Sequence, residues 1–149
     1  MIRNSLDRSY YFKGMLLLVR KDEKISVEEK ELLMKVGKIL RFNQQFCEQT
    51  INDLLQNEHI TELPLQFSTK EWAEIFLKDG IKIAYSDHQL HVEEFNWLRQ
   101  IARTNKISDQ WLSDQISSFL INHNTDEEIS FEVEKIYLQK NKTHLMKHL

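Results

Sequence analysis

The sequence predicts an all-α fold of about seven helices in one domain that spans residues 1–149. The chain contains 3 Gly and 1 Pro, which is too few turn-forming residues for a sheet of many strands. Apolar side chains recur along most of the chain at the three- and four-residue spacing of amphipathic helices. One helical pattern occurs twice, so we expect two three-helix units related by a pseudo-twofold axis, followed by a C-terminal helix.

The duplication keeps one offset of 65 positions. Residues 22–29 read DEKISVEE and residues 87–94 read DHQLHVEE, so that position 22 matches 87 and position 29 matches 94. Identical residues stand at the same offset beyond this motif: Lys13/Lys78, Leu33/Leu98, Gln45/Gln110, Ile51/Ile116, Leu55/Leu120 and Asn57/Asn122. Residues 12–57 and 77–122 align without a gap, which indicates two copies of one unit joined by a linker at 58–67.

The first helix of each copy is expected to lie at the centre of the molecule. These helices run from about 7 to 21 and from about 69 to 86, and both are apolar on most faces. Ser68 and Glu71 form a capping-box pattern at the start of the later one.

The second helix of each copy has a clear start signal. It begins at Ser26 in the first copy and at His91 in the second, and a glutamate follows three residues later, Glu29 or Glu94. A polar N-cap followed at this spacing by Glu is the pattern of a capping box.

The third helix of each copy is expected to begin at Asn43 or Ser108, since both residue types are good N-caps. We expect these helices to bury the following side chains: Phe46, Ile51, Leu54 and Leu55 in the first copy, and Trp111, Ile116, Phe119 and Leu120 in the second.

A final helix is predicted over about 126–142. Apolar residues alternate between Ile129 and Val133 as they would in a strand, but the spacing of Ile129, Val133 and Ile136 favours a helix.

Charge and cysteine content exclude several classes of protein. The chain has 20 Lys+Arg, 23 Asp+Glu and a net charge of −3, so it lacks the basic field that a nucleic-acid partner requires. Cys47 is the sole cysteine and matches Leu112 at the offset of 65, which favours a core residue in a reducing, cytoplasmic setting. The longest apolar run, 15–19, is too short to cross a bilayer. Weak peripheral membrane association would need the lysines of the C-terminal tail to share one face: Lys135, Lys140, Lys142 and Lys147.

The duplicated turn resembles the motif of the tellurite-resistance TerB family. That motif is similar to D-G-x-[IV]-x-x-x-E after an apolar helix, and it matches Asp22, Ile25 and Glu29 in the first copy and Asp87, Leu90 and Glu94 in the second. The resemblance extends over roughly residues 10–122. It implies a role in resistance to tellurite and other stresses, with a metal-linked role for the acidic positions. The family usually has Gly directly after Asp, where this chain has Glu23 and His88, so the residues do not favour a left-handed turn there.

The acidic positions allow two interpretations. As structural residues, Glu29 and Glu94 cap their helices, and Asp22 and Asp87 hold the turns by local hydrogen bonds. Alternatively, the pseudo-twofold axis brings the four carboxylates together, and they bind Mg²⁺ or Ca²⁺ through oxygen ligands. An EF-hand is excluded because apolar residues stand where its bidentate Glu would be.

A more local metal site is also a hypothesis. His88 and His91, with Asp87 and Glu94, could bind Zn²⁺ or Ni²⁺. The first copy has Glu23 in place of the first histidine, and His91 is already explained as an N-cap, so this site is the weaker one.

From the sequence we therefore expect a non-enzymatic adaptor whose acidic turns bind a divalent cation or a basic protein partner. No glycine-rich phosphate loop, G-x-S-x-G elbow or H-E-x-x-H motif occurs in the chain. The alternative is a metal-dependent hydrolase-like enzyme, which would require four carboxylates to converge on a pocket: Asp22, Glu29, Asp87 and Glu94.

Overall fold

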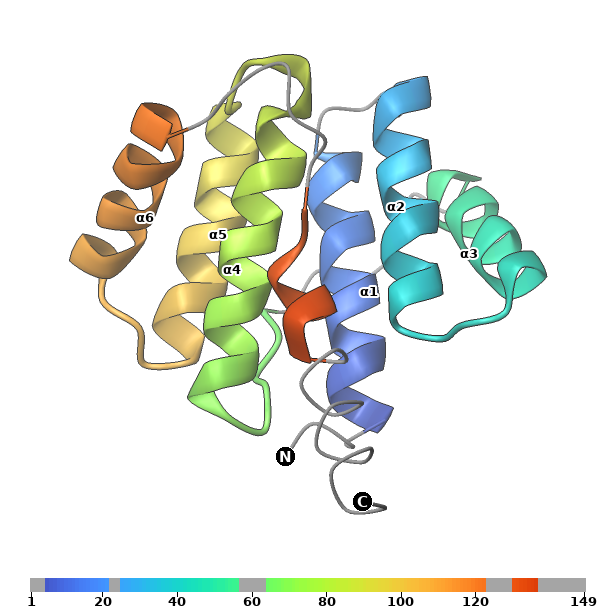
Figure 1. The fold of residues 1–149 in the computed structure, drawn as a ribbon, viewed down its shortest axis with the longest axis horizontal. Coiled ribbons are helices and arrows are strands. Elements are labelled where there is room, and N and C mark those ends of the chain that lie inside the picture. Colours follow the sequence, from blue (N-terminus) through green and yellow to red (C-terminus); the bar gives the residue numbers. More distant parts are fainter. Residues whose placement is uncertain (1–4, 22–24, 57–63, 123–129, 137–149) are drawn as a thin grey trace, which may run out of the picture.

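The part of the chain that the computed structural model describes is all-α (Figure 1). It comprises residues 5–21, 25–56, 64–122 and 130–136. The helices are α1 (Ser5–Arg20), α2 (Val27–Ile39), α3 (Gln44–Gln56), α4 (Lys70–Ala84), the 3-10 helix η1 (Tyr85–Asp87), α5 (Val92–Thr104) and α6 (Asp109–Asn122). A short helix at 132–136 follows. Among these described helices, none is both long and apolar enough to span a bilayer.

The helices stand side by side with α1 and α4 at the centre (Figure 1). α2 packs on α1 and α5 packs on α4, while α3 and α6 lie at the two outer ends. The central position of α1 and α4 is the one predicted from their apolar faces. Residues 15–19 of α1 are at most 1% exposed.

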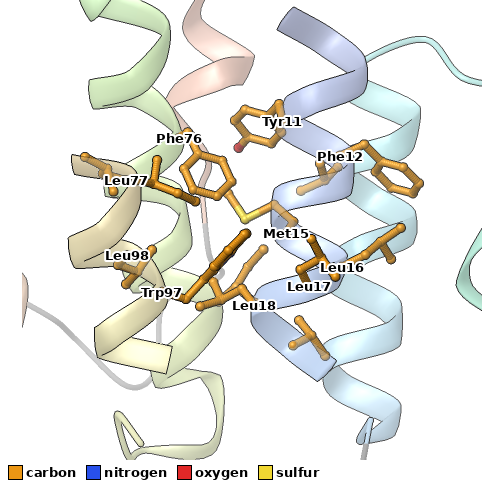
Figure 2. Close-up of a cluster of buried hydrophobic side chains, with 14 of the residues drawn as sticks. Tyr11, Phe12, Met15, Leu16, Leu17, Leu18, Phe76, Leu77, Trp97 and Leu98 are labelled. Carbon is orange, nitrogen blue, oxygen red and sulfur yellow. The ribbon is translucent and has the colours of Figure 1, made fainter. Parts of the chain in front are cut away.

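The core forms where α1 meets α4 and α5. Figure 2 shows Met15 on α1 directed toward Phe76 on α4 and Trp97 on α5. The indole N–H of Trp97 donates to the carbonyl of Gly14 at 3.2 Å, which satisfies a buried polar group. A Cβ at Gly14 would lie 2.6 Å from the Phe76 ring, so glycine permits the close approach of α1 and α4 at this point.

Helices α2 and α5 end in the same way. Arg41 and Lys106 both have left-handed backbones, with φ of 66° and 61°. In each case the next N–H bonds back to the helix: that of Phe42 to the carbonyl of Gly37 at 2.9 Å, and that of Ile107 to a carbonyl five residues earlier at 2.8 Å. This is the hydrogen bonding of a Schellman C-cap, and it occurs at the offset of 65.

The predicted capping box at the start of α4 is wrong. Thr69 is the N-cap, and its hydroxyl accepts the N–H of Trp72 at 3.1 Å. Ser68 instead donates its N–H to Asp7 at 2.8 Å and its hydroxyl to the other oxygen of the same carboxylate. Asp7 is 1% exposed and needs these donors, so a tertiary contact overrides the local pattern.

The third helices begin as predicted but are less buried than predicted. Asn43 accepts the N–H of Gln45 at 2.8 Å, and Ser108 accepts that of Trp111 at 3.0 Å. Ile51 and Leu54 are buried, and Trp111, Ile116 and Phe119 are half-buried. Phe46 and Leu120 are 51% and 54% exposed, contrary to the prediction, because α3 and α6 are the outermost helices and pack on one side only. The side chain of Leu55 lies outside the described part.

The C-terminal helix is described only in part. Helix covers 132–136, while Ser130 and Phe131 are not helical, which corrects the prediction of one continuous helix through these positions. The predicted ends at 126 and 142, and most of the linker at 58–67, lie outside the described residues. The described end of that linker is held by Asn105, whose side chain bonds the backbone of Leu65 and Phe67, both at 2.8 Å.

Candidate functional site

The first turns of α2 and α5 lie at the same end of the molecule, where α1 and α4 finish (Figure 1). We call residues 26–29 and 91–94 together the acidic end. The N-terminus of a helix carries unpaired N–H groups and a partial positive charge, so carboxylates are stabilised there.

Glu29 caps its own helix, as predicted. Its carboxylate accepts the N–H of Ser26 at 3.1 Å, and the Ser26 hydroxyl accepts the N–H of Glu29 at 3.0 Å. The side chain is 4% exposed. This predicted capping box is therefore confirmed.

Glu94 has the matching role on α5. Its carboxylate accepts the N–H of His91 at 3.1 Å, and the residue is 1% exposed. Glu29 and Glu94 are therefore both buried, and each bonds the N-cap of its own helix. These cap bonds are the ones that the structural interpretation of the two acids predicts.

His88 adopts the left-handed turn that its side chain did not favour. Its φ is 69°, and it closes η1 by donating its N–H to the carbonyl of Tyr85 at 2.9 Å. Histidine tolerates this backbone region better than most residues. The chain therefore has a left-handed residue where the TerB motif usually has Gly, and its exposed side chain lies in a loop before the first turn of α5.

Two of the four predicted carboxylates are not placed. Asp22, with Glu23, lies outside the described residues, and so does the side chain of Asp87. Among the residues that are described, no three His, Cys, Asp or Glu side chains are grouped so as to hold a metal ion. The four-carboxylate site and the His88/His91 site therefore stay predictions.

The acidic end also exposes apolar surface. Val27 and Val92 are the first residues of α2 and α5, and they are 70% and 69% exposed. Exposed Glu28 and Glu93 follow them directly. The capping pattern predicted the roles of the buried acids, but it gave no signal for the exposed Val-Glu pairs beside them.

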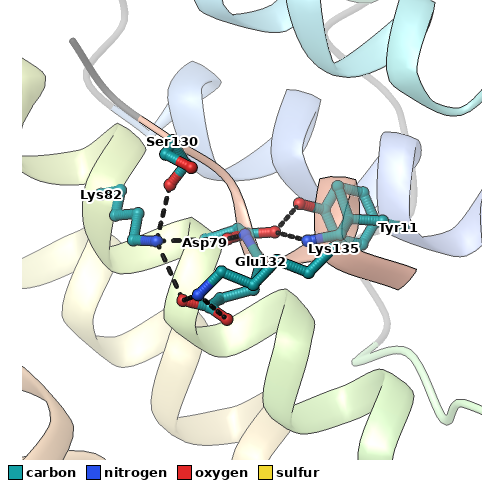
Figure 3. A network of polar contacts seen from close by, with 7 residues as sticks. Tyr11, Asp79, Lys82, Ser130, Glu132 and Lys135 are labelled. Atoms are coloured by element: carbon teal, nitrogen blue, oxygen red, sulfur yellow. Dashed lines mark hydrogen bonds and ion pairs between the residues drawn. The ribbon is translucent and has the colours of Figure 1, made fainter. Parts of the chain in front are cut away.

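Asp79 on α4 is a buried polar residue that the sequence analysis also missed (Figure 3). Its side chain is fully buried, and one oxygen accepts the N–H of Glu132 at 2.6 Å. The other oxygen accepts the N–H of Val133 at 3.1 Å and the hydroxyl of Tyr11. Burial raises the pKa of Asp79 from 3.8 to about 6, against the opposing effect of these donors and of Lys82, whose ammonium is 3.9 Å away.

An apolar groove separates α1 from α3. Its volume is about 390 Å³, and it is lined mainly by Phe12, Leu16, Phe42, Phe46 and Leu54, with Lys13 and Asp53 among the polar lining residues. Cys47 follows Phe46 on α3, is not one of the residues that line this groove, and is 1% exposed. Burial raises the pKa of its thiol, so it is a core residue with little thiolate character, as its pairing with Leu112 predicts.

Comparisons of the chain with protein-family models, with curated proteins and with solved structures found no match. A function is therefore inferred from the residues and their geometry. The acidic end combines exposed acids with exposed valines at the starts of two helices.

Proposed function

We propose that the chain is a non-enzymatic adaptor of the TerB type that binds a basic protein surface through its acidic end. The observation that carries this proposal is the pair of exposed Val-Glu steps, Val27-Glu28 and Val92-Glu93, at one end of the molecule. Apolar contacts flanked by carboxylates fit a partner with apolar side chains between Lys or Arg residues, because opposite charges fix orientation and speed association.

Equivalent residues in the two halves support the duplication on which this proposal relies. Glu29 and Glu94 accept the N-cap N–H at the same distance, and Arg41 and Lys106 close their helices with the same left-handed geometry. We propose that α1–α3 and α4–α6 are copies related by a pseudo-twofold axis, which would present one Val-Glu step from each copy on the same face.

The TerB resemblance is supported by His88, which takes a left-handed backbone at the position of the family's Gly. On that resemblance, the adaptor would act in a cytoplasmic response to tellurite or related chemical stress. The hydrolase alternative is less favoured, because a general acid/base pair must reach a substrate and Glu29 and Glu94 are buried against their own helices. A divalent cation held by Asp22 and Asp87 is the second candidate, since each acid stands five positions before the first residue of a helix that begins at the acidic end.

The proposal is tested by charge reversal on matched surfaces. Glu28→Lys/Glu93→Lys changes the acidic end, and Glu48→Lys/Asp114→Lys makes the same change in net charge on exposed positions of α3 and α6. Affinity capture with the full chain from its source cells should lose its specific partners with the first variant and retain them with the second. Equal capture by both variants would contradict the proposal. Reversal in a first turn costs about 0.3–1 kcal/mol per residue, so thermal unfolding is measured alongside.

A further inference from the structure

We infer that residues 130–136 form a releasable strap, an intrachain peptide ligand whose backbone Asp79 and Lys82 hold against α1, α2 and α4. The strap lies along the central helices in Figure 1. It is outside both duplicated segments, and the position that matches Asp79 at the offset of 65 is Gly14. The strap is thus an addition to one side of the duplicated core.

Asp79 and Lys82 bind the strap mainly through its main-chain groups. Asp79 accepts the N–H groups of Glu132 and Val133, which are the first two residues of the short helix. Lys82 donates to the carbonyl of Ser130 at 2.7 Å and to the Glu132 carboxylate at 3.3 Å (Figure 3). One carboxylate and one ammonium, three residues apart on α4, therefore bind donors and acceptors of the same short segment.

Three strap side chains supply the apolar contacts. Phe131 and Val133 are fully buried, and Ile136 is 5% exposed. Lys35 on α2 places its ammonium 5.8 Å from the centre of the Phe131 ring, and Tyr11 on α1 reaches Asp79 from the opposite side. The surface under the strap therefore fits a segment with an aromatic residue, a β-branched residue two positions later, and free N–H groups after the aromatic residue.

The strap is releasable because the group that anchors it, Asp79, is a buried carboxylate. Burying a carboxylate is costly, and replacing a whole buried ion pair by apolar residues of similar volume is often neutral or stabilising. An anchor of this kind therefore gives a weaker hold than apolar packing alone would, and its strength depends on the protonation of Asp79.

Ionisation of Asp79 weakens the strap. The charged groups around it are Lys82 on α4, Glu132 and Lys135 on the strap and Lys35 on α2, and the hydroxyl of Tyr11 faces it from α1. Release hydrates the carboxylate and returns its pKa toward 3.8, so the docked state holds the proton more tightly. Docking is therefore strongest below pH 4 and falls as pH rises to about 6, by at most about a hundredfold, since each unit of pKa difference is a factor of ten.

Amide hydrogen exchange of the full chain, followed by NMR between pH 4.5 and 8, tests this inference. The protection factors of the Glu132 and Val133 amides, corrected for intrinsic exchange rates, should be lower than those of core amides in α1 and α4. They should fall by tenfold or more as pH rises from 4.5 to 8, and at each pH they should stay below the protection factors of the core amides. Strap amides that exchange only together with the core at every pH would overturn the inference.

Two variants separate Asp79 from other titrating groups. The two strap N–H groups bond different oxygens of Asp79, so Asp79→Asn keeps an acceptor for one of them. It cannot ionise, so it should abolish the pH dependence. Asp53→Asn, an exposed acid on α3, should leave it intact. A pH dependence that persists in Asp79→Asn would overturn the role of Asp79, and the wild-type series alone decides releasability if that variant does not fold.

Discussion

Three buried polar residues join segments that are distant in the sequence. Asp7 binds Ser68, Asn105 binds the linker end at Leu65, and Asp79 binds the strap at Glu132. Each has its hydrogen-bonding capacity met by backbone or hydroxyl groups, as burial requires. Polar residues of this kind set where the irregular segments lie on the helical core.

Asp79 makes the stability of the protein depend on pH in a predictable direction. Its pKa is about 6 in the folded chain and 3.8 ordinarily, so folding favours the protonated form. The associated stability is present below pH 3.8 and is lost as pH rises through 6, up to about 3 kcal/mol. Asp79→Asn should therefore be more stable than wild type at pH 8 and similar at pH 4.5, as measured by urea unfolding. A variant that is less stable than wild type at pH 8 would contradict this.

For single residues, hydrogen bonds to neighbours in the sequence could be predicted, and hydrogen bonds to residues far away in the sequence could not. The caps formed by Ser26 with Glu29 and by Asn43 depend on residues two or three positions away, and these were found. Asp7 and Asp79 bond residues 61 and 53 positions away, so nothing in their neighbourhood indicates the partner. Two further acids, Glu71 and Glu74, stand on the same helix, so residue type alone did not single out Asp79.

The central helices and the outermost helices of the molecule differ in how they are packed. Among the described helices, α1 packs against α2, α3, α4 and α5, while α3 packs mainly against α2 and α1. The contact between α2 and α3 is close, because a Cβ added at Gly37 would lie 2.4 Å from the sulfur of Cys47. Glycine at this position lets the two helices approach each other.

Gly37→Ala should destabilise the protein by about 1–3 kcal/mol, because the added methyl group overpacks the α2–α3 contact. The Cβ of Cys47 would lie 3.5 Å from the new methyl group, which is an ordinary contact. Gly37→Ala/Cys47→Ala should therefore recover most of the loss caused by Gly37→Ala, relative to Cys47→Ala alone, in thermal or urea unfolding. Additive losses in this double-mutant cycle would contradict the packing argument.

The spacing of apolar residues predicted the positions of the helices better than it predicted which side chains are buried. It identified α1 and α4 as central because their apolar residues cover most faces. It could not show that α3 and α6 are outermost, because Phe46 and Leu120 follow the same helical spacing as core residues. The strap combines the two patterns that made it ambiguous, with non-helical residues 130–131 followed by a helix at 132–136.

At the scale of the whole molecule, α2 and α5 start at the same end, and the proposed binding surface draws on both helix starts for this reason (Figure 1). The equal offset of the two turns predicted a shared motif, and the described helices α2 and α5 that follow these turns begin at the same end of the molecule. Convergence of the four carboxylates depends on Asp22 and the side chain of Asp87, which are outside the described residues. The predicted cation site therefore needs a direct test.

Titration calorimetry of Mg²⁺, Ca²⁺, Mn²⁺ and Zn²⁺ into the chelator-stripped chain tests the cation candidate. Glu29 and Glu94 already accept helix-cap bonds, so few oxygens remain, and we expect dissociation constants of about 1 mM or weaker. Asp22→Asn/Asp87→Asn should then behave as wild type does. Tight, saturable binding in wild type that this variant loses would instead establish a cation site at the acidic end.

The most direct test of the adaptor proposal is site-specific photocrosslinking in the source cells. A benzophenone amino acid replaces Val27 or Val92 at the acidic end, or Phe46 or Ile121 as exposed controls on α3 and α6. The proposal predicts that positions 27 and 92 crosslink to the same partner and that the control positions do not. Crosslinks from the control positions alone would show that the binding surface lies elsewhere and contradict the proposal.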